Sequence, residues 1–212
     1  MKIKKVANPA NSVMEKRTSI RKYDTSVKIK REEMYSILQD AMTAPSSFNL
    51  QPWRFVVIDS PAGKELIKPY MLFNQEQAAT ASAVIAVFGD MHNFSYADEI
   101  LTANVDKNLM TEEYKDQMMG MMTSYRADIT DESIKNSLLI DCGFVTMQLM
   151  LAAKGYGYDT NPIGGYKRKE LTEALGLDIK RYIPVLLLSI GKAAEEGNNS
   201  IRFSVEEITQ WK

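Results

Sequence analysis

The stretch Ala44-Pro45-Ser46-Ser47-Phe48-Asn49-Leu50-Gln51-Pro52-Trp53-Arg54-Phe55 holds two hydroxyls and two carboxamides between two prolines. It leads directly into the apolar run 55–58 (FVVI), which predicts a buried strand. Proline fixes φ and lacks an N–H, so Pro45 ends the preceding helix and Pro52 stiffens the start of the strand. Asn49 and Gln51 each donate and accept hydrogen bonds, which suits the edge of a planar heterocycle. The loop therefore predicts a site for a neutral ring.

A cationic turn precedes this loop. Arg17, Ser19 and Arg21 alternate with other residues in the run 17–23 (RTSIRKY). Guanidinium groups bind phosphate oxygens in bidentate fashion, and a hydroxyl adds a further hydrogen bond. The same spacing occurs in ordinary solvated charge clusters, just as Asn49 and Gln51 are common turn formers. The residues taken alone leave both interpretations open.

Read in order, these segments resemble the FMN-dependent nitroreductase family. The family pattern is Arg-x-Ser-x-Arg/Lys-x-aromatic, followed by Pro-Ser-Ser-x-Asn-x-Gln-Pro-Trp. Further matches follow in the expected order at Phe73-Asn74, at 161–166 (NPIGGY) and at 201–203 (IRF). The first loop is highly specific, and the resemblance extends roughly from Val13 to Ile208.

The resemblance implies a ligand and its contacts. It implies that Arg17, Ser19 and Arg21 hold the phosphate and ribityl chain of FMN, with Arg202 as a further phosphate ligand. It also implies that the Asn74 amide faces the pyrimidine edge of the flavin, and that a glycine-rich segment presents a backbone N–H to flavin N5, the atom that accepts hydride. The other positions implied to surround the flavin are Pro45, Ser46, Ser47, Asn49, Pro162, Ile163, Gly164 and Gly165. By the same matching, Gln51 supports the loop and Trp53 packs in the core.

Three positions depart from the family pattern. Ser200 and Gln77 stand where relatives often carry lysine, and Gly164 stands where they often carry glutamate. A cation at the first two positions would strengthen phosphate binding or stabilise the negative charge of reduced flavin. The departures leave the phosphate affinity and the redox potential open. A backbone contact at Gly164 does not depend on the side chain, so the absence of glutamate leaves it possible.

Composition narrows the class of protein. Twenty-six basic residues nearly cancel twenty-seven acidic ones, and no basic stripe is present, so no nucleic-acid partner is expected. No apolar run approaches the ~20 residues that span a bilayer, and the lysines near the N-terminus lack the apolar core of a signal peptide. We therefore expect no membrane partner. The single cysteine fits a reducing compartment, and a cytoplasmic location is expected.

One cysteine and one histidine also restrict the chemistry. A structural zinc site needs about four Cys or His ligands, so no metal site is expected. No Gly-x-Ser-x-Gly segment, Gly-x-Gly-x-x-Gly segment or P-loop is present. Cys142 lies mid-helix among apolar residues and is expected to be buried, and His92 is expected to be exposed in a loop. A cofactor is therefore expected to carry the chemistry.

The length of the chain allows one domain over residues 1–212, and the resemblance implies that this domain is α+β. Apolar residues recur at helical spacing over 31–44, strands are predicted at 55–58, 83–88 and 183–190, and a short extended piece at 158–160. Because helices separate the few strands, we expect a mixed central sheet flanked by helices. Asp98–Arg126 is predicted to be a variable insertion of two helices, and Lys192–Lys212 a C-terminal tail.

The longest predicted helix, from Asp131 as its cap to Lys154, is apolar nearly all round. Either a central position in the domain or a partner subunit would account for that composition. The resemblance implies the nitroreductase fold and an intertwined homodimer in which the tails reach across to the other subunit. It also implies two FMN sites at the dimer interface.

The resulting hypothesis is an oxidoreductase that passes hydride from NADPH or NADH through flavin N5 to nitroaromatics, quinones or similar small acceptors, in a ping-pong mechanism. A dehalogenase or specialised reductase of the same superfamily is an alternative, and so is a protein that stores or senses FMN without turnover. Methionines 118, 119, 121 and 122 lie in the insertion, where they fill apolar gaps or contact the acceptor. The physiological acceptor is not determined by these residues.

Overall fold

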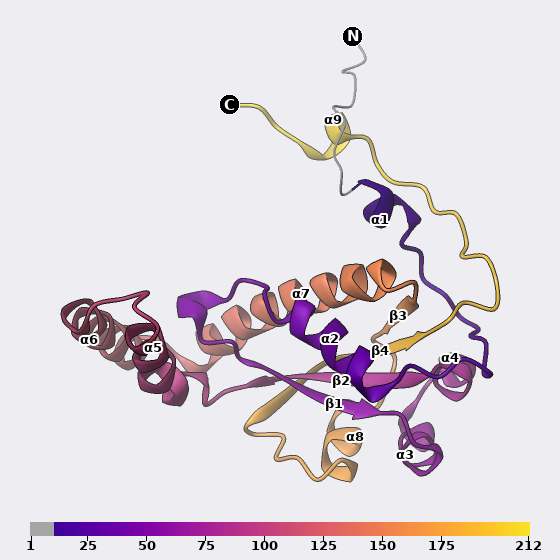
Figure 1. Cartoon of the computed structure of the whole chain (residues 1–212), viewed down its shortest axis with the longest axis horizontal. Coiled ribbons are helices and arrows are strands. Elements are labelled where there is room, and N and C mark those ends of the chain that lie inside the picture. The colour runs from indigo at the N-terminus through magenta and orange to yellow at the C-terminus, as the bar shows by residue number, and fades with distance from the viewer. Residues whose placement is uncertain (1–10) are drawn as a thin grey trace.

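The computed structural model describes residues 11–212. Four strands are surrounded by helices and short 3-10 turns (Figure 1). In chain order the elements are α1 (Asn11–Lys16), α2 (Arg31–Ala41), η1 (Ser47–Asn49), β1 (Trp53–Ile58), α3 (Pro61–Ile67), η2 (Lys68–Tyr70), α4 (Gln75–Thr80), β2 (Ala83–Asp90), η3 (Asn93–Tyr96), α5 (Ala97–Asp106), α6 (Glu112–Asp128), α7 (Asp131–Gly155), β3 (Asp159–Ile163), α8 (Arg168–Ala174), β4 (Tyr182–Gly191) and α9 (Val205–Ile208).

The sheet has the order β1-β2-β4-β3, and every neighbouring pair is antiparallel. The α+β class is confirmed, but the expectation of a mixed sheet is corrected. The helices between β1 and β2 lie at the end of the sheet where β1 finishes, so the chain re-enters without crossing a face (Figure 1). An isolated bridge between Ser19 and Thr160 supplies a parallel contact outside the named strands.

Strand β2 is buried along its whole length and carries core residues on both faces. On one face Ile85 and Val87 pack against α2 and α7, and on the other Val84 and Ala86 pack against α3 and α8. Successive side chains of a strand point to opposite faces of the sheet, so a strand that is covered on both faces carries apolar residues along its whole length. The strand predicted at 83–88 extends two residues further, to Asp90.

Helix α7 is capped by Thr130, whose Oγ1 accepts a hydrogen bond from the Ser133 N–H at 3.2 Å. The predicted cap, Asp131, is instead the first helical residue, because either residue type can cap and the backbone leaves Thr130 extended. One face of α7 packs on the sheet, whereas Leu139, Ile140, Phe144 and Met147 are exposed on the other. By length and hydropathy α7 could also cross a membrane, a test that core helices of water-soluble proteins pass as well.

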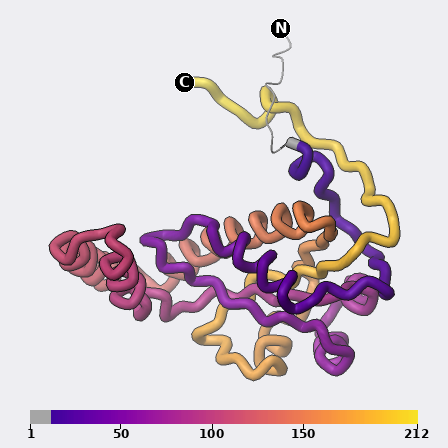
Figure 2. The backbone as a smooth tube through the Cα atoms, viewed as in Figure 1, coloured from indigo at the N-terminus to yellow at the C-terminus, as the bar shows by residue number. Residues whose placement is uncertain are grey.

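Helices α5 and α6 form the predicted two-helix insertion, which projects from one end of the body (Figure 1). Residues 107–111 separate the two helices, and Thr111 caps α6. Met122 is buried with Leu101, Met118 and Met119 are partly packed, and Met121 stays half exposed. At the opposite end, the chain after β4 runs away from the body past α1 (Figure 2). The domain limits 1–212 stay a prediction, because residues 1–10 lie outside the described residues.

Candidate functional site

A cavity of about 760 Å³ lies between α1, the turn that follows it, β3 and the C-terminal tail. The turn is fixed to β3 because the Ile20 N–H donates to the Thr160 carbonyl at 3.2 Å. The lining residues are Met14, Glu15, Arg17, Thr18, Ser19, Arg21, Asn74, Asn161, Pro162, Asn198, Asn199, Ser200 and Arg202. Residues separated by almost the whole chain thus meet around one cavity.

Three guanidinium groups line this cavity, from Arg17, Arg21 and Arg202. None of them forms an ion pair with a carboxylate of residues 11–212. The Arg202 Nη1 donates only locally, to Ser200 Oγ at 2.6 Å and to the Ile201 carbonyl at 3.0 Å. Unpaired guanidinium groups around a polar cavity suit an anionic ligand such as a phosphate.

Asn74 lies at the rim of the cavity, next to the glycine pair that follows β3. A Cβ built on Gly165 would lie 3.8 Å from Asn74 Oδ1 and 3.4 Å from the Phe73 ring. The Gly165 carbonyl also accepts a hydrogen bond from the Leu72 N–H at 3.0 Å. By contrast, a Cβ on Gly164 meets nothing within 4 Å, so open space surrounds that position. A carboxamide and a close backbone segment are therefore side by side.

The loop 45–51 has an unusual backbone. Phe48, Asn49 and Gln51 have φ of 52°, 56° and 45°, the left-handed region that each non-glycine residue enters at a cost of about 1–2 kcal/mol. Gln51 makes two of the hydrogen bonds that close the loop on itself: its N–H donates to Ser46 Oγ at 3.0 Å, and its Nε2 donates to the Asn49 carbonyl at 3.2 Å. Gln51 therefore supports the loop, as expected.

A buried carboxylate on α7 holds the middle of the loop. The Ser47 N–H lies 3.1 Å from both oxygens of Asp141, and Ser47 Oγ donates to Oδ1 at 3.3 Å. Burial raises the pKa of Asp141, and the hydrogen bonds from Ser47 offset part of that effect. Sequence reasoning missed this residue, although one acidic residue inside an apolar stretch of helix was a signal.

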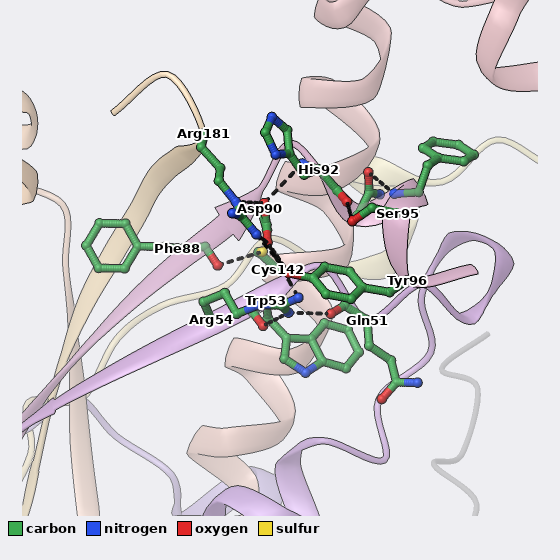
Figure 3. A network of polar contacts seen from close by, with 12 residues as sticks. Gln51, Trp53, Arg54, Phe88, Asp90, His92, Ser95, Tyr96, Cys142 and Arg181 are labelled. Atoms are coloured by element: carbon green, nitrogen blue, oxygen red, sulfur yellow. Dashed lines mark hydrogen bonds and ion pairs between the residues drawn. The ribbon is translucent and has the colours of Figure 1, made fainter. Parts of the chain in front are cut away.

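A second buried carboxylate, Asp90, stands at the end of β2 and is joined through Arg54 to Gln51, the last residue of the loop (Figure 3). Arg181 donates to it through Nε and Nη2, both at 3.0 Å, and Tyr96 Oη donates at 3.0 Å. Arg54 Nη2 lies 3.5 Å from Asp90 Oδ2. Burial alone would raise the pKa of Asp90, but the hydrogen bonds from Arg181, the His92 N–H and Tyr96 together lower it.

An apolar pocket of about 250 Å³ adjoins the loop on the side of the insertion. Three aromatic rings surround it: the Phe48 centroid lies 5.3 Å from that of Tyr125 and 6.3 Å from that of Phe94. The remaining lining residues are Ser47, Leu50, Asn93, Ile129, Ile134 and Ser137. A flat apolar molecule would fit such a pocket.

Comparison with known proteins identifies the family. A model of the nitroreductase family matches residues 14–192. The chain belongs to the nitroreductase family. A Bacillus subtilis protein named "Putative NAD(P)H nitroreductase YdgI" is 51% identical over 97% of this chain and 98% of its own. A crystal structure from Exiguobacterium sibiricum, described as a putative nitroreductase in complex with FMN, is 48% identical, covers 98% of this chain and 99% of its own, and has a TM-score of 0.94. A Lactiplantibacillus plantarum "CLA biosynthesis enone reductase" is 37% identical over 97% of this chain and 95% of its own.

A single nitroreductase chain does not bring all the predicted site residues together. The cavity unites Arg17, Ser19, Arg21, Asn74, Pro162 and Arg202, and Ile163, Gly164 and Gly165 follow at the end of β3. Pro45, Ser46, Ser47 and Asn49 lie at the other end of the molecule, against α7 and near the insertion (Figure 1). The two halves of the expected site are therefore separated within one chain.

The remaining reactive side chains of this nitroreductase take no part in either half. Cys142 is fully buried on α7, where burial raises the pKa of its thiol to about 12, so it is not a nucleophile. His92 is exposed, and its backbone N–H rather than its ring contacts Asp90. Trp53 is buried in the core, as predicted. Within residues 11–212 no group of three or more His, Cys, Asp and Glu side chains is placed to hold a metal ion.

Proposed function

We propose that this chain is an FMN-dependent oxidoreductase that uses NADPH or NADH to reduce nitroaromatics, quinones or similar small acceptors. The observation that carries the proposal is the cavity lined by Ser19, Asn74 and three guanidinium groups that form no ion pair within residues 11–212. Cations and a hydroxyl suit a phosphate, and a carboxamide suits the edge of a ring, so the donor set fits FMN. The similarity to a structure described in complex with FMN supports the same ligand.

Each residue type has a defined task in this proposal. Arg17, Ser19, Arg21 and Arg202 would bind the phosphate and ribityl chain, and Asn74 the pyrimidine edge. FMN supplies the hydride-transfer chemistry when it is bound. The residues of the chain bind and orient the reactants and exclude water, and no side chain acts as a general acid or base. The remaining flavin contacts would come from Pro45, Ser46, Ser47, Asn49, Pro162, Ile163, Gly164 and Gly165.

A homodimer would complete the site. The loop 45–49 and the arginine-lined cavity lie apart in one chain, so a second copy has to supply one of them (Figure 1). Two apolar surfaces are available for that contact: the outer face of α7, and the tail, whose exposed side chains are Ile201, Phe203, Val205, Ile208 and Trp211. Exposed apolar surface of this extent is typical of an interface. We therefore propose an intertwined dimer with exchanged tails. We also propose that the dimer is cytoplasmic and has no nucleic-acid or membrane partner.

Purification tests the cofactor. We expect yellow protein that releases FMN on denaturation at close to one per chain. Colourless protein that also fails to bind added FMN would overturn the proposal. Adding NADPH without oxygen should bleach the colour, whereas a protein that only stores FMN would keep it.

Kinetic order tests how the two substrates share the site. Donor and acceptor must each approach the same face of one ring, and two planar molecules cannot stack there together. The oxidised nicotinamide therefore leaves before the acceptor binds, which is a ping-pong order. Double-reciprocal plots at several fixed acceptor concentrations should be parallel. Intersecting lines in the absence of product would mean that both substrates bind at once.

Reduction of an enone is a second candidate function. The aromatic pocket beside the loop 45–51 would hold an apolar chain next to the ring, and the 37% identical Lactiplantibacillus plantarum relative is named an enone reductase. Initial rates with a nitroaromatic, a quinone and an enone bearing an alkyl chain would separate the candidates. A kcat/KM for the enone at least as high as for the quinone would favour this second function.

A further inference from the structure

Asp90 is the centre of a polar network at the end of the sheet (Figure 3). Its side chain is fully buried, and its two oxygens accept hydrogen bonds from Arg181, from Tyr96 and from the His92 N–H. Its own N–H donates to the Pro52 carbonyl at 2.8 Å, which fixes the start of β1 to the end of β2. A buried carboxylate with this many donors has one stable position.

Arg54 extends the network to the loop 45–51. Its Nη2 lies 3.5 Å from Asp90, while its Nη1 donates to the Gln51 carbonyl at 3.0 Å and to the Trp53 carbonyl at 2.7 Å. The guanidinium carbon is also 4.6 Å from the centre of the Tyr96 ring. One planar fork thus joins the buried carboxylate to the residue that ends the strained loop, a geometry that lysine cannot reproduce.

Tyr96 connects the same network to the insertion. It is the last residue before α5, and its Oη accepts from Arg181 Nη2 at 2.9 Å while donating to Asp90 at 3.0 Å. Tyr96, at the base of the insertion, and Gln51, at the end of the loop, are therefore both connected to the Arg54 guanidinium and, through it or directly, to the Asp90 carboxylate. A shift of α5 at its first turn would be transmitted to Arg54 and so to Gln51.

We propose that Arg54, held in place by Asp90 and Tyr96, is a positioning residue that fixes the left-handed conformation of the loop 45–51 and couples that loop to the insertion. Its effect on flavin rests on the proposed function, because only then does the loop border FMN. The effect on the loop itself does not. Asp141 holds the middle of the same loop independently, through Ser47.

Hydrogen exchange in Arg54→Lys tests the positioning role, in protein with and without FMN. The reporters are the N–H groups of Asn49, Leu50 and Gln51, which donate to Ser46 and Ser47. We expect their exchange to be about tenfold faster than in wild type, because lysine keeps the charge but loses the fork. The matched control is Arg168→Lys: Arg168 also donates to two backbone carbonyls and stacks on a tyrosine, but on α8. The control should leave the loop amides at the wild-type rate.

Tyr96→Phe tests the coupling, because it keeps the ring under Arg54 and removes only the hydroxyl. We expect about threefold faster exchange in the loop. In the double variant with Arg54→Lys, the increase in exchange rate should be smaller than the product of the two single increases. In FMN-loaded protein, Arg54→Lys should also alter the visible circular dichroism of the flavin and raise the acceptor KM more than it lowers kcat. Wild-type exchange and wild-type dichroism in Arg54→Lys would overturn the inference. If wild type binds no FMN, the proposed function fails, while loop exchange still decides the positioning role.

Discussion

The two halves of the candidate site differ in how they are held. In the cavity half, the guanidinium groups of Arg17, Arg21 and Arg202 form no ion pair with a carboxylate of residues 11–212, and only the backbone N–H of Arg21 donates to one, Glu195 Oε1, at 3.0 Å. Arg202 comes from a tail that runs away from the body (Figure 2). In the loop half, two buried carboxylates hold a backbone with three left-handed residues. The first half is available to a ligand, and the second is shaped before any ligand arrives.

This difference has an energetic meaning. Unpaired surface cations contribute little to folding, so the cavity half can be tuned for phosphate without loss of stability. Buried carboxylates are costly unless their donors are in place, so the loop half contributes to the fold as well as to the site. Substitutions in the two halves should therefore separate binding from stability.

The largest effect is expected for Asp90→Ala, on stability. It leaves Arg181 and Tyr96 without their acceptor and removes a buried, fully satisfied carboxylate. We expect the free energy of unfolding in urea to fall by about 3 kcal/mol, the lower end for a buried pair because the arginines are one-third exposed. The control is Asp131→Ala, whose partner Arg126 lies on the surface, and its change should stay within about 0.5 kcal/mol. Equal effects would mean that burial does not distinguish the two carboxylates.

Arg202→Ala should show the opposite profile, with weaker FMN binding at unchanged stability. Loss of a charge-assisted hydrogen bond to phosphate costs about 1–3 kcal/mol of binding free energy. Titration with FMN measures it, and urea unfolding of the FMN-free protein checks the stability. Unchanged FMN affinity would show that the tail has been assigned wrongly.

Ser200→Lys sharpens the same test from the other side. Ser200 lines the cavity beside Arg202, at the position where the family resemblance led us to expect lysine. An added cation should tighten FMN binding by about 0.5–1 kcal/mol at low salt and less at high salt. A weaker complex would mean that this position does not face the phosphate.

The sequence predicted the loop half only in outline. Its prolines, hydroxyls and amides could be recognised as a motif because they are contiguous in sequence, and Gln51 supports the loop as expected. Asp90 and Arg181 were not, because they are 91 positions apart and meet only when β2 and β4 pair. No local pattern reports a contact of that kind. The same limit explains the sheet, whose antiparallel pairing depends on where the intervening helices lie.

The cavity half was predictable for a different reason. Arg17, Ser19, Arg21, Asn74 and Arg202 are far apart in sequence, but the order of their segments matched one family. What the order could not give is that these residues and the loop 45–49 lie at opposite ends of one chain. That separation follows from the length of α7 and the position of β3.

The two carboxylates of the loop half should respond to pH with opposite signs. The pKa of Asp90 is lowered by folding, so its contribution to stability is present above the unfolded pKa and is lost as pH falls through the folded pKa. The pKa of Asp141 is raised, so deprotonation costs more in the folded protein, and stability falls as pH rises from the unfolded pKa through the folded one. Unfolding free energies of wild type, Asp90→Asn and Asp141→Asn across the acidic range would measure both. If the contributions of Asp90 and Asp141 to the unfolding free energy changed with pH in the same direction, the opposite pKa shifts assigned to them would be contradicted.

The smallest effects on turnover are expected where neither half is touched. Cys142→Ala removes a buried side chain and should lower the free energy of unfolding by about 1 kcal/mol. His92→Ala changes an exposed ring and should leave stability unaltered, because the contact of His92 with Asp90 comes from its backbone. Both variants should keep kcat within about a factor of ten of wild type, because in the proposed function the cofactor and not a side chain carries hydride transfer. The measurement is steady-state turnover with FMN occupancy determined on the same sample. A larger loss with FMN fully bound would give that residue a direct part in the chemistry, and both halves of the site would then have to be extended to reach it.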